Sequence, residues 1–496
     1  MSLKKNTIAN YLGQGCVALM NIAFVPLYIK YLGIEAYGLI GVFAMLQAWL
    51  SILDVGMTPT LNREMARYTA GALNDESIRN LLRSFEVICF IMAFFATVLI
   101  WSSAEWISVY WLNTVALPPQ VVAMAITIIG FVISLRFIEG LYKGAILGLQ
   151  KQVLLNVAIS GLAILRGGGA VLVLIWISPS IQAFFVWQAL VSILSIFIFV
   201  IISYRYLPHL MQPAKFSFYQ LKKIWRFSGG MLGTTLAVLL LVQADKVILS
   251  HILSLEIFGY YILAGTVVTT LYLVNGPISQ SCFPAFTKMV SKDHISELIE
   301  IYHQSSQLTS VLIFPAGLML IFFGEQLLSL WTGDIELAHN VFPLLRILTI
   351  GTMLNCLMSI PYQLTLAYGW SSFGMRQNIV AVILFVPAIL FVAPRYGAIG
   401  TAWIWVVLNA GYVLISIYFI HTQILPKEKF RWYVDDVMRP AAGAVSVAVI
   451  LWAVQPDINS PLVKLIWLVG VALSMILSAG LSAPMIRNYC LLKFSH

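Results

Sequence analysis

The feature that most constrains this chain is a succession of apolar stretches, each about 18 residues or longer, that runs from one end of the sequence to the other. A helix of that length crosses the roughly 30 Å of hydrocarbon in a bilayer. Transmembrane β-strands are shorter, at about ten residues of alternating polarity. Because lipid offers backbone groups no hydrogen-bond partners, helices are the remaining way to cross it. The sequence therefore predicts an all-α polytopic membrane protein.

The composition agrees with this prediction and excludes several classes of protein. Only 10% of the residues are charged, whereas soluble domains carry about 25%, so no sizeable water-soluble domain is expected. The five cysteines are scattered without a CxxC pair, which predicts neither disulfides nor a metal site. We expect no cofactor. The net charge of +9 is typical of basic loops on one side of a membrane, and nucleic acid is not expected as a partner.

Apolar stretches and their breaks give about fourteen predicted spans, within a range of 12–14. They are 8–29, 37–55, 84–103, 120–148, 153–177, 181–203, 228–250, 257–280, 306–325, 340–364, 378–394, 399–420, 440–455 and 462–483. If the N-terminus is inside, 22 of the 29 Lys and Arg residues fall on the inner side and three on the outer side. Basic loops face the cytoplasm, so both termini are predicted to be cytoplasmic.

A short repeat indicates two related halves. The pattern Glu-x-aromatic-Gly occurs in the turn containing Glu35 and Gly38, and again in the turn containing Glu256 and Gly259. Each turn follows the first span of a six-span unit, and transporters are often built from such repeats with the substrate between them. We therefore predict four parts along the chain. They are a six-helix bundle (1–203), a basic cytoplasmic linker (204–227), a second six-helix bundle (228–420), and a cytoplasmic loop with an extra two-helix hairpin and tail (421–496).

The linker mixes aromatic and aliphatic residues with lysines, among them Phe218, Trp225 and Lys222. Two interpretations stay open for it. One is a short amphipathic helix on an anionic inner leaflet, and the other is an ordinary basic loop.

Charged residues inside the predicted spans are the candidate functional residues, because charge in hydrocarbon is costly and usually functional. Arg136, Glu139 and Lys143 share one face of their helix. The other charged residues in spans are Arg166, Asp245, Lys246 and Arg346. Five cations against two acids leave an excess of positive charge, which needs an anion, water or both.

We therefore predict a cationic cavity that binds an anionic substrate. Its expected contacts are Arg136, Lys143, Arg166, Lys246 and Arg346, with Arg166 and Lys246 as the strongest because they lie in different predicted halves. Glu139, Asp245 and Asp54 are expected to balance charge or to bind a coupling ion. The alternative is structural: Glu139 and Lys143 can pair at i,i+4, and Asp245 can neutralise an arginine of a neighbouring helix.

Sequence motifs for catalysis are missing. The chain has no Walker loop, HExxH, nucleophile elbow or DxD pair, so an ATP-driven pump is excluded within it and an enzyme is not expected. The seven histidines are spread along the sequence, and no histidine cluster in the membrane is expected. The rival interpretation is a membrane glycosyltransferase or O-antigen polymerase, which would be expected to carry a large outer loop with carboxylates.

Three groups of residues resemble a known family. They are Asn10-Tyr11-Leu12 with Tyr31-Leu32-Gly33 and Tyr37-Gly38, Leu53-Asp54-Val55-Gly56 with Arg63 and Ala66-Arg67, and Gln243-x-Asp245-Lys246 with Gly259-Tyr260-Tyr261. This pattern resembles the Wzx-type O-antigen and polysaccharide flippases of the multidrug/oligosaccharidyl-lipid/polysaccharide exporter superfamily.

The resemblance implies two six-helix bundles around a central cationic cavity, in the inner membrane of a bacterium. It also implies a substrate of a few sugars on undecaprenyl pyrophosphate. We expect the protein to move this substrate from the cytoplasmic to the periplasmic leaflet by alternating access, with coupling to a proton or another ion. Membrane lipids and other polysaccharide assembly proteins, such as those of lipopolysaccharide synthesis, are the implied partners. Another exporter of the same superfamily stays an alternative.

The predicted topology is tested by cysteine labelling. Cysteines introduced next to Arg79, Lys222, Lys292 or Lys429 are expected to react with a membrane-impermeant reagent only after the cytoplasmic side is opened, because these loops belong to the basic side. Labelling of any of these four loops in intact cells would contradict the topology.

Overall fold

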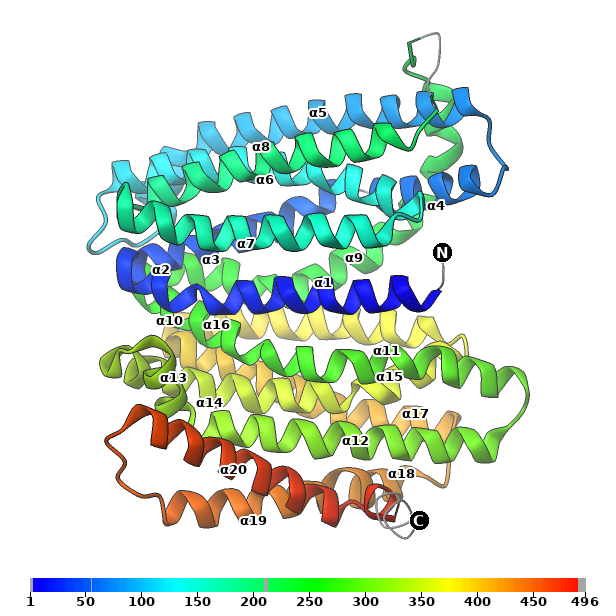
Figure 1. The fold of residues 1–496 in the computed structure, drawn as a ribbon. Helices are drawn as coiled ribbons and strands as arrows, with labels where there is room; N and C mark the ends of the chain where they lie inside the picture. The colour runs from blue at the N-terminus through cyan, green and yellow to red at the C-terminus, as the bar shows by residue number, and fades with distance from the viewer. Residues whose placement is uncertain (1–2, 55, 209–212, 489–496) are drawn as a thin grey trace. The chain divides into compact units, whose positions relative to one another are not determined.

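A computed structural model describes residues 3–54, 56–208 and 213–488, without the side chains of residues 3–9 and 219–235. The described residues fold almost entirely into helices (Figure 1) and contain no β-strand, although Asn113 and Ser254 form an isolated parallel β-bridge. The chain divides into two compact units, Met1–Gly259 and Tyr260–His496. The predicted division into two six-helix bundles with an added hairpin remains a prediction.

The first unit holds the N-terminal helices. Its elements are α1 (Leu3–Ala23), α2 (Val25–Leu32), α3 (Ile34–Leu50), the 3-10 turn η1 (Ser51–Asp54), α4 (Met57–Thr69), α5 (Asp75–Trp106), the π-helical η2 (Ile107–Trp111), α6 (Pro119–Gly148), α7 (Gln152–Trp176), α8 (Ile181–Arg205), α9 (Phe218–Ile252) and the start of α10 (Leu255–Val268).

The second unit holds the remaining helices, two of which are π-helical. Its elements after α10 are α11 (Thr270–Ser291), α12 (Ile295–Phe322), α13 (Gly324–Thr332), α14 (Ile335–Leu357), α15 (Ser359–Ala367), α16 (Ser371–Gly411), the π-helix η3 (Tyr412–Ser416), α17 (Ile417–Gln423), α18 (Lys429–Arg431), the π-helix η4 (Trp432–Met438), α19 (Arg439–Ala453) and α20 (Pro461–Ser482).

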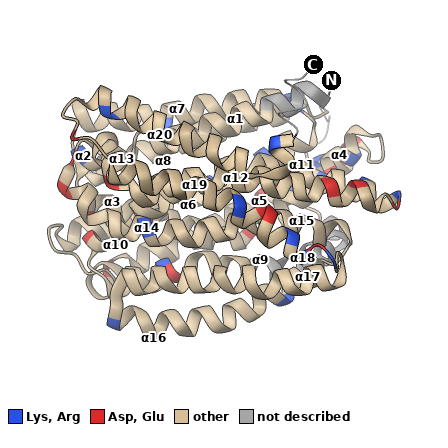
Figure 2. Cartoon of the chain, turned by 90° about the horizontal axis from the view of Figure 1, so that it is seen from below, with Lys and Arg blue, Asp and Glu red and all other residues tan. Residues whose placement is uncertain are grey.

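Twelve helical segments of the described residues are long and apolar enough to cross a membrane. Residues other than Lys, Arg, Asp and Glu make up most of the helix length (Figure 2). The predicted all-α polytopic class is confirmed, whereas the number fourteen is not. One of the twelve segments, Ser371–Gln423, contains two predicted spans, and its helix α16 is interrupted at Gly397, where φ is 59°.

Polar side chains fix where the long helices begin. The Asn74 side chain accepts a hydrogen bond from Ser77 N at 3.0 Å and so caps α5, whose first turn also holds Asp75 and Glu76. An acid in the first turn is stabilised by the positive end of the helix dipole. Ser180 caps α8 in the same way through Ala183 N. These caps satisfy backbone donors that a helix leaves free at its N-terminus.

The helix α6 is the centre of packing in the first unit. It contacts α3, α4, α5, α7 and α8, and α5, α6, α7 and α8 run side by side (Figure 1). Glycines on α6 permit the close approaches: a Cβ at Gly144 would collide with Thr58 of α4, and one at Gly130 would collide with Ile100 of α5. Close helix contacts through small residues are the usual means of association in membranes.

In the second unit, the helix with the most packing partners is α12. It contacts α11, α14, α19 and α20, and the buried residues on it belong to two hydrophobic clusters, one toward α11 and α17 and one toward α19 and α20. Large apolar side chains point outward elsewhere, as Leu384 and Phe391 of α16 do. In a membrane protein such exposed apolar faces meet lipid tails.

The basic linker ends in a helix that continues into the next span. α9 runs without a break from Phe218 to Ile252, so the second half of the linker 204–227 and the predicted span 228–250 form one helix. The side chains of Lys222, Lys223, Arg226 and Trp225 lie outside the described residues, as do Lys493 and the side chains of Lys4 and Lys5. The amphipathic interpretation of the linker therefore stays open.

The two Glu-x-aromatic-Gly turns lie against each other within the first unit. A Cβ added at Gly38 would lie 2.5 Å from the carbonyl oxygen of Leu255, and one added at Gly259 would lie 2.5 Å from that of Ile34. Each turn thus places its glycine against the backbone of the other. Nearby, the Glu35 carboxylate accepts hydrogen bonds from Val115 N at 2.7 Å and from Ala116 N at 2.8 Å.

This reciprocal contact predicts that alanine is not tolerated at either glycine. Gly38→Ala and Gly259→Ala force the two turns apart, and we expect each to lower stability by about 1–3 kcal/mol, the usual range for overpacking. Thermal unfolding of the purified protein in detergent measures the change.

Gly265→Ala is the matched control on α10, since no atom lies within 4 Å of the added methyl group. We expect it to be neutral or slightly stabilising, because Ala is favoured over Gly inside a helix by about 0.5–1 kcal/mol. Equal midpoints for Gly38→Ala and Gly265→Ala would contradict the proposed role of the turn contact.

Candidate functional site

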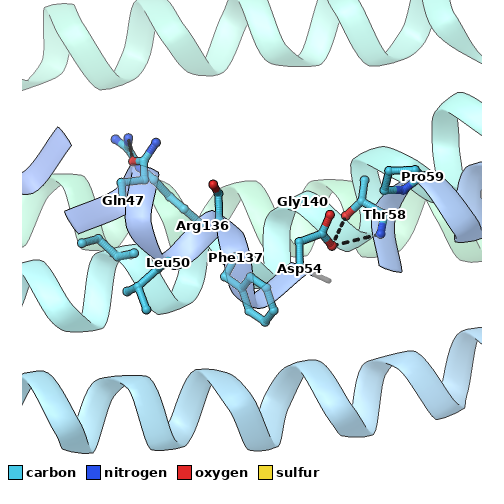
Figure 3. Close-up of a pocket in the computed structure, with 10 residues that line it drawn as sticks. Gln47, Leu50, Asp54, Thr58, Pro59, Arg136, Phe137 and Gly140 are labelled. Carbon is cyan, nitrogen blue, oxygen red and sulfur yellow. Dashed lines mark hydrogen bonds between the residues drawn. The ribbon is translucent and has the colours of Figure 1, made fainter. Parts of the chain in front are cut away.

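A pocket of about 350 Å³ lies between α3, η1, α4 and α6 of the first unit. It is lined by Gln47, Leu50, Ser51, Asp54, Thr58, Pro59, Ile133, Arg136, Phe137 and Gly140. Figure 3 shows Gln47 and Arg136 at one end, Asp54 with Thr58 at the other, and the Phe137 ring between them. The pocket therefore has a cationic end and an anionic end.

A break in the chain sets the position of Asp54. α3 tightens into the 3-10 turn η1, which ends at Asp54, and α4 begins after Gly56, whose φ of 75° is left-handed. Asp54 Oδ1 accepts hydrogen bonds from Thr58 N at 2.9 Å and from Thr58 Oγ1 at 2.8 Å (Figure 3). Both bonds use the same carboxylate oxygen, which leaves Oδ2 without a partner among the described residues.

Arg136 is held by neutral groups. Its Nη1 donates to Gln47 Oε1 at 2.6 Å, its Nη2 donates to Gln188 Oε1 at 3.0 Å, and its guanidinium lies 4.6 Å from the centre of the Phe43 ring. None of the ion pairs among the described residues includes Arg136. A glutamine oxygen orients a guanidinium without removing its charge, so the positive charge stays available at the pocket.

The orientation of the Gln188 amide follows from its second contact. Gln188 is buried on α8, and its Nε2 donates to the backbone oxygen of Arg166 at 3.5 Å. An amide that donates on one side must present its oxygen on the other, and that oxygen faces Arg136. Gln188 therefore links the two arginines of α6 and α7.

Glu139 is shared by two cations next to this arginine. It is buried on α6, and it pairs with Lys143 Nζ at 2.5 Å and with Arg166 Nη2 at 3.3 Å. Arg166 Nη2 also lies 3.3 Å from Ser195 Oγ of α8. The structure thus contains the structural pair that helical spacing allows between Glu139 and Lys143. It adds Arg166 from another helix to the same carboxylate.

Positive charge exceeds negative charge in this region. Lys143 and Arg166 share one carboxylate, Glu139, whereas Arg136 has two neutral acceptors. With Asp54 at the far end of the pocket counted as well, three cations and two acids leave one excess positive charge. Unpaired charge of this kind is costly in hydrocarbon and marks a path for a charged ligand or for water.

The two other predicted cations are found elsewhere. Lys246 on α9 lies 3.3 Å from Asp245 Oδ1 and donates to the backbone oxygen of Val242 at 2.7 Å. It belongs to the same compact unit as Arg166, although the predicted bundles placed the two in different halves. Arg346, in the second unit, is exposed and lies 5.4 Å from the centre of the Phe342 ring. A single cavity lined by all five cations remains a prediction.

Sequence reasoning missed the neutral partners. Gln47 and Gln188 are far from Arg136 in the chain, by 89 and 52 residues. A signal was available, because a buried arginine without an acid needs other acceptors, and glutamines within apolar spans are few. The sequence does not tell which of them meets which arginine.

Two of the seven histidines lie at the same stretch of α12, an arrangement that the sequence did not predict. In the second unit, the Tyr302 hydroxyl lies 3.2 Å from His421 Nε2, and the neighbouring His303 contacts two carboxylates, Asp436 and Glu428. Both histidines lie within candidate membrane spans. Their separation along the chain concealed this, since helix packing alone brings α12 and α17 together.

Comparison with proteins of known structure gives the fold. The chain is similar to the lipid II flippase MurJ in its inward closed conformation, with a TM-score of 0.70, 12% identity, and coverage of 98% of this chain and 99% of that one. It is also similar to an inward-facing multidrug resistance MATE family transporter of the MOP superfamily, with a TM-score of 0.66, 14% identity, and coverage of 82% and 95%.

Comparison with curated sequences points the same way. A protein of Shigella flexneri named as an O-antigen transporter is 22% identical over 417 residues, which cover 83% of this chain and 96% of that protein. The lipopolysaccharide biosynthesis protein WzxC of Escherichia coli (strain K12) is 23% identical over 235 residues, 46% of each chain. The model of one family, described as polysaccharide biosynthesis protein, matches residues 31–335. Because this match covers more than half of the sequence, the chain belongs to the polysaccharide biosynthesis protein family.

Proposed function

We propose that this protein is a flippase that moves a lipid-linked oligosaccharide from the cytoplasmic to the periplasmic leaflet of a bacterial inner membrane. The cargo is an O-antigen repeat unit, or a similar glycan, on undecaprenyl pyrophosphate. The family match and the relatives named for O-antigen and lipopolysaccharide support this class of cargo. The similarity to the fold of lipid flippases and exporters supports transport by alternating access.

The observation that carries the proposal is Arg136 with its two glutamine acceptors. A pyrophosphate must leave water and cross hydrocarbon, and a charged guanidinium can replace its hydration with charge-assisted hydrogen bonds. A carboxylate beside Arg136 would compete with such a ligand, whereas Gln47 and Gln188 do not. A cationic drug would instead be repelled at this end of the pocket.

Arg166 and Lys143 extend the positive region beside Arg136. Both pair with Glu139, and one carboxylate cannot neutralise two cations. A pyrophosphate that moves past Glu139 could therefore bind the positive charge of Arg166 or Lys143 that Glu139 does not neutralise. Lys246 and Arg346 complete the proposed cargo contacts. We propose that both side chains reach the same cavity as Arg136.

Export against a gradient needs an energy source, which we assign to ion coupling. Asp54 lines the same pocket as Arg136, and its Oδ2 is open to a proton or a cation. Glu139 and Asp245 are the other candidate coupling residues. The protein performs no covalent chemistry in this proposal, and both of its termini face the cytoplasm.

The first test changes the glutamines to acids. Gln47→Glu and Gln188→Glu keep an acceptor beside Arg136 but add a carboxylate that neutralises it. A charge-assisted hydrogen bond contributes about 1.5–3 kcal/mol, so we expect export to fall by about tenfold or more. Surface glycan in cells that lack the native flippase measures export, and membrane immunoblots measure insertion.

Gln152→Glu is the matched control, because Gln152 accepts a hydrogen bond from Asn10 and has no ion-pair or hydrogen-bond contact to a cation among the side chains that the structure describes. It should export glycan normally. Full export by both Gln47→Glu and Gln188→Glu would show that Arg136 does not carry an anionic cargo.

The second test removes the two cations predicted to be the strongest contacts. Arg166→Ala and Lys246→Ala should each reduce surface glycan while the protein still inserts. Arg166→Lys should restore export only in part, because Lys lacks the planar fork that binds two phosphate oxygens. Lys464→Ala, outside the pocket at the start of α20, is the control. Normal export by both Arg166→Ala and Lys246→Ala would contradict the cationic-cavity mechanism.

A further inference from the structure

A buried histidine in the second unit bridges two carboxylates. His303 of α12 is fully buried; its Nδ1 lies 2.5 Å from Asp436 Oδ2 of η4, and its Nε2 lies 3.0 Å from Glu428 Oε2 in the loop before α18. Asp436 is also fully buried, whereas the Glu428 side chain is 18% exposed. This cluster plays no part in the proposed cargo site.

Two further bonds hold the Asp436 side of the cluster. Gln307, one turn after His303 on α12, donates from Nε2 to Asp436 Oδ1 at 2.9 Å. The oxygen of the same amide accepts a hydrogen bond from Met485 N at 2.9 Å, just after α20. The cluster therefore ties α12 to η4 and to the end of the last helix pair, α19 and α20.

The other titratable groups around the cluster come from several elements. They are Tyr302 of α12, Cys282 of α11, His421 of α17, Lys429 and Arg431 of α18, Tyr433 and Asp435 of η4, and Arg439 of α19. Arg431 lies 3.5 Å from Glu428, and Arg439 pairs with Asp435. Among the described residues, α13, α14, α15 and α20 bring no ion pair to His303, Asp436 or Glu428.

The geometry fixes how many protons the cluster must hold. Each of the two contacts of His303 needs one hydrogen atom between nitrogen and oxygen, so the three groups together must carry at least two protons. These are either a doubly protonated imidazole between two carboxylates or a neutral imidazole with one protonated carboxyl group. When one of the two protons leaves, one ring nitrogen faces a carboxylate with no hydrogen between them.

The contact that breaks is the one to Glu428. Asp436 keeps a second donor, Gln307, and is fully buried, so its bond to His303 is retained. Glu428 is partly exposed and has Arg431 as a remaining partner. Release of Glu428 costs least, because water and Arg431 can solvate it.

We propose that His303, Asp436 and Glu428 form a proton-binding site that fastens the loop 424–428 to α12 when it is occupied and releases it when one proton is lost. The segment that follows is suited to movement. It enters η4, a π-helix of seven residues that contains Asp436, and Tyr433 of η4 donates to the backbone oxygen of Val413 in the π-helix η3 at 2.7 Å. π-Helical turns are rare and are frequently found at functional sites.

The site makes the attachment of the last helix pair sensitive to pH. Release of Glu428 removes one of the links between α12 and the chain that leads into α19, while the Asp436 and Gln307 links hold. The loop 424–428 lies on the side that the lysine and arginine distribution predicts to be cytoplasmic, so cytoplasmic pH would set its occupancy.

Hydrogen–deuterium exchange of the full-length protein in nanodiscs tests the proposal. We compare uptake in residues 424–431 from about pH 5.5 to about pH 9, a range that spans the ordinary pKa of histidine near 6.5, with labelling times scaled to the intrinsic rate at each pH. In the wild type, exchange of this segment should rise by about tenfold with pH, the factor that corresponds to losing a hydrogen bond of about 1.4 kcal/mol.

Variants separate the proton site from a purely structural cluster. His303→Gln should abolish the pH transition, because an amide does not titrate in this range. Glu428→Gln should keep the segment protected at every pH, since its amide can donate to the unprotonated ring nitrogen. Glu428→Ala should leave it unprotected at every pH. His421→Gln is the control, because His421 is equally buried but bonds to Tyr302 and a backbone oxygen, and it should retain the transition.

Wild-type protection that does not change with pH would overturn the proposal, and so would a transition that survives in Glu428→Gln. Because Glu428 is partly exposed, its variants test the proposal even if His303→Gln fails to fold. The readout is local exchange, so its result does not depend on whether the cargo is a lipid-linked oligosaccharide.

Discussion

The structure depends on the fact that hydrocarbon supplies no hydrogen bonds. The backbone meets this constraint by forming helices almost throughout the described residues. Polar side chains within the spans must meet it individually, and each one has to find its partner on a neighbouring helix. The polar contacts therefore follow from which helices are neighbours. Charged side chains that keep an excess charge after these contacts indicate where a ligand or water binds.

The two units solve this problem with different partners. In the first unit, Arg136 is held by two amide oxygens, which leave its charge in place. In the second, His303 is held by two carboxylates, which make its bonds depend on protons. Neutral acceptors suit a site that must attract an external anion, since the ligand itself completes the charge balance. Titratable acceptors suit a site whose own state changes with pH.

The sequence predicted the fold class well and the site only in part. Long apolar stretches predict helices because length and hydrophobicity are local properties, and the basic loops predict the inner side. The predicted cations Arg136, Lys143 and Arg166 do come together through Glu139 and Gln188. Of the three, Arg136 lines the pocket that also contains Asp54. Their partners could not be predicted, because contacts between residues 89, 52 and 133 positions apart depend on helix packing. The break at Gly397, in contrast, falls between the predicted spans 378–394 and 399–420, because Pro394 and Arg395 interrupt the apolar sequence there.

The contact between the turns at Gly38 and Gly259 has a mechanical consequence. Each glycine lies against a backbone carbonyl, and the side chain of the same residue, Leu255 or Ile34, borders the contact. Surfaces that interlock through side chains from both sides must change rotamers before they separate, whereas a glycine contributes no side chain that has to move. The glycines themselves contribute dispersion and weak Cα–H···O contacts, which are worth about 0.5–1 kcal/mol each. The two glycines therefore give the turns a smooth seam, at which only Leu255 and Ile34 would have to adjust if the turns parted and closed again.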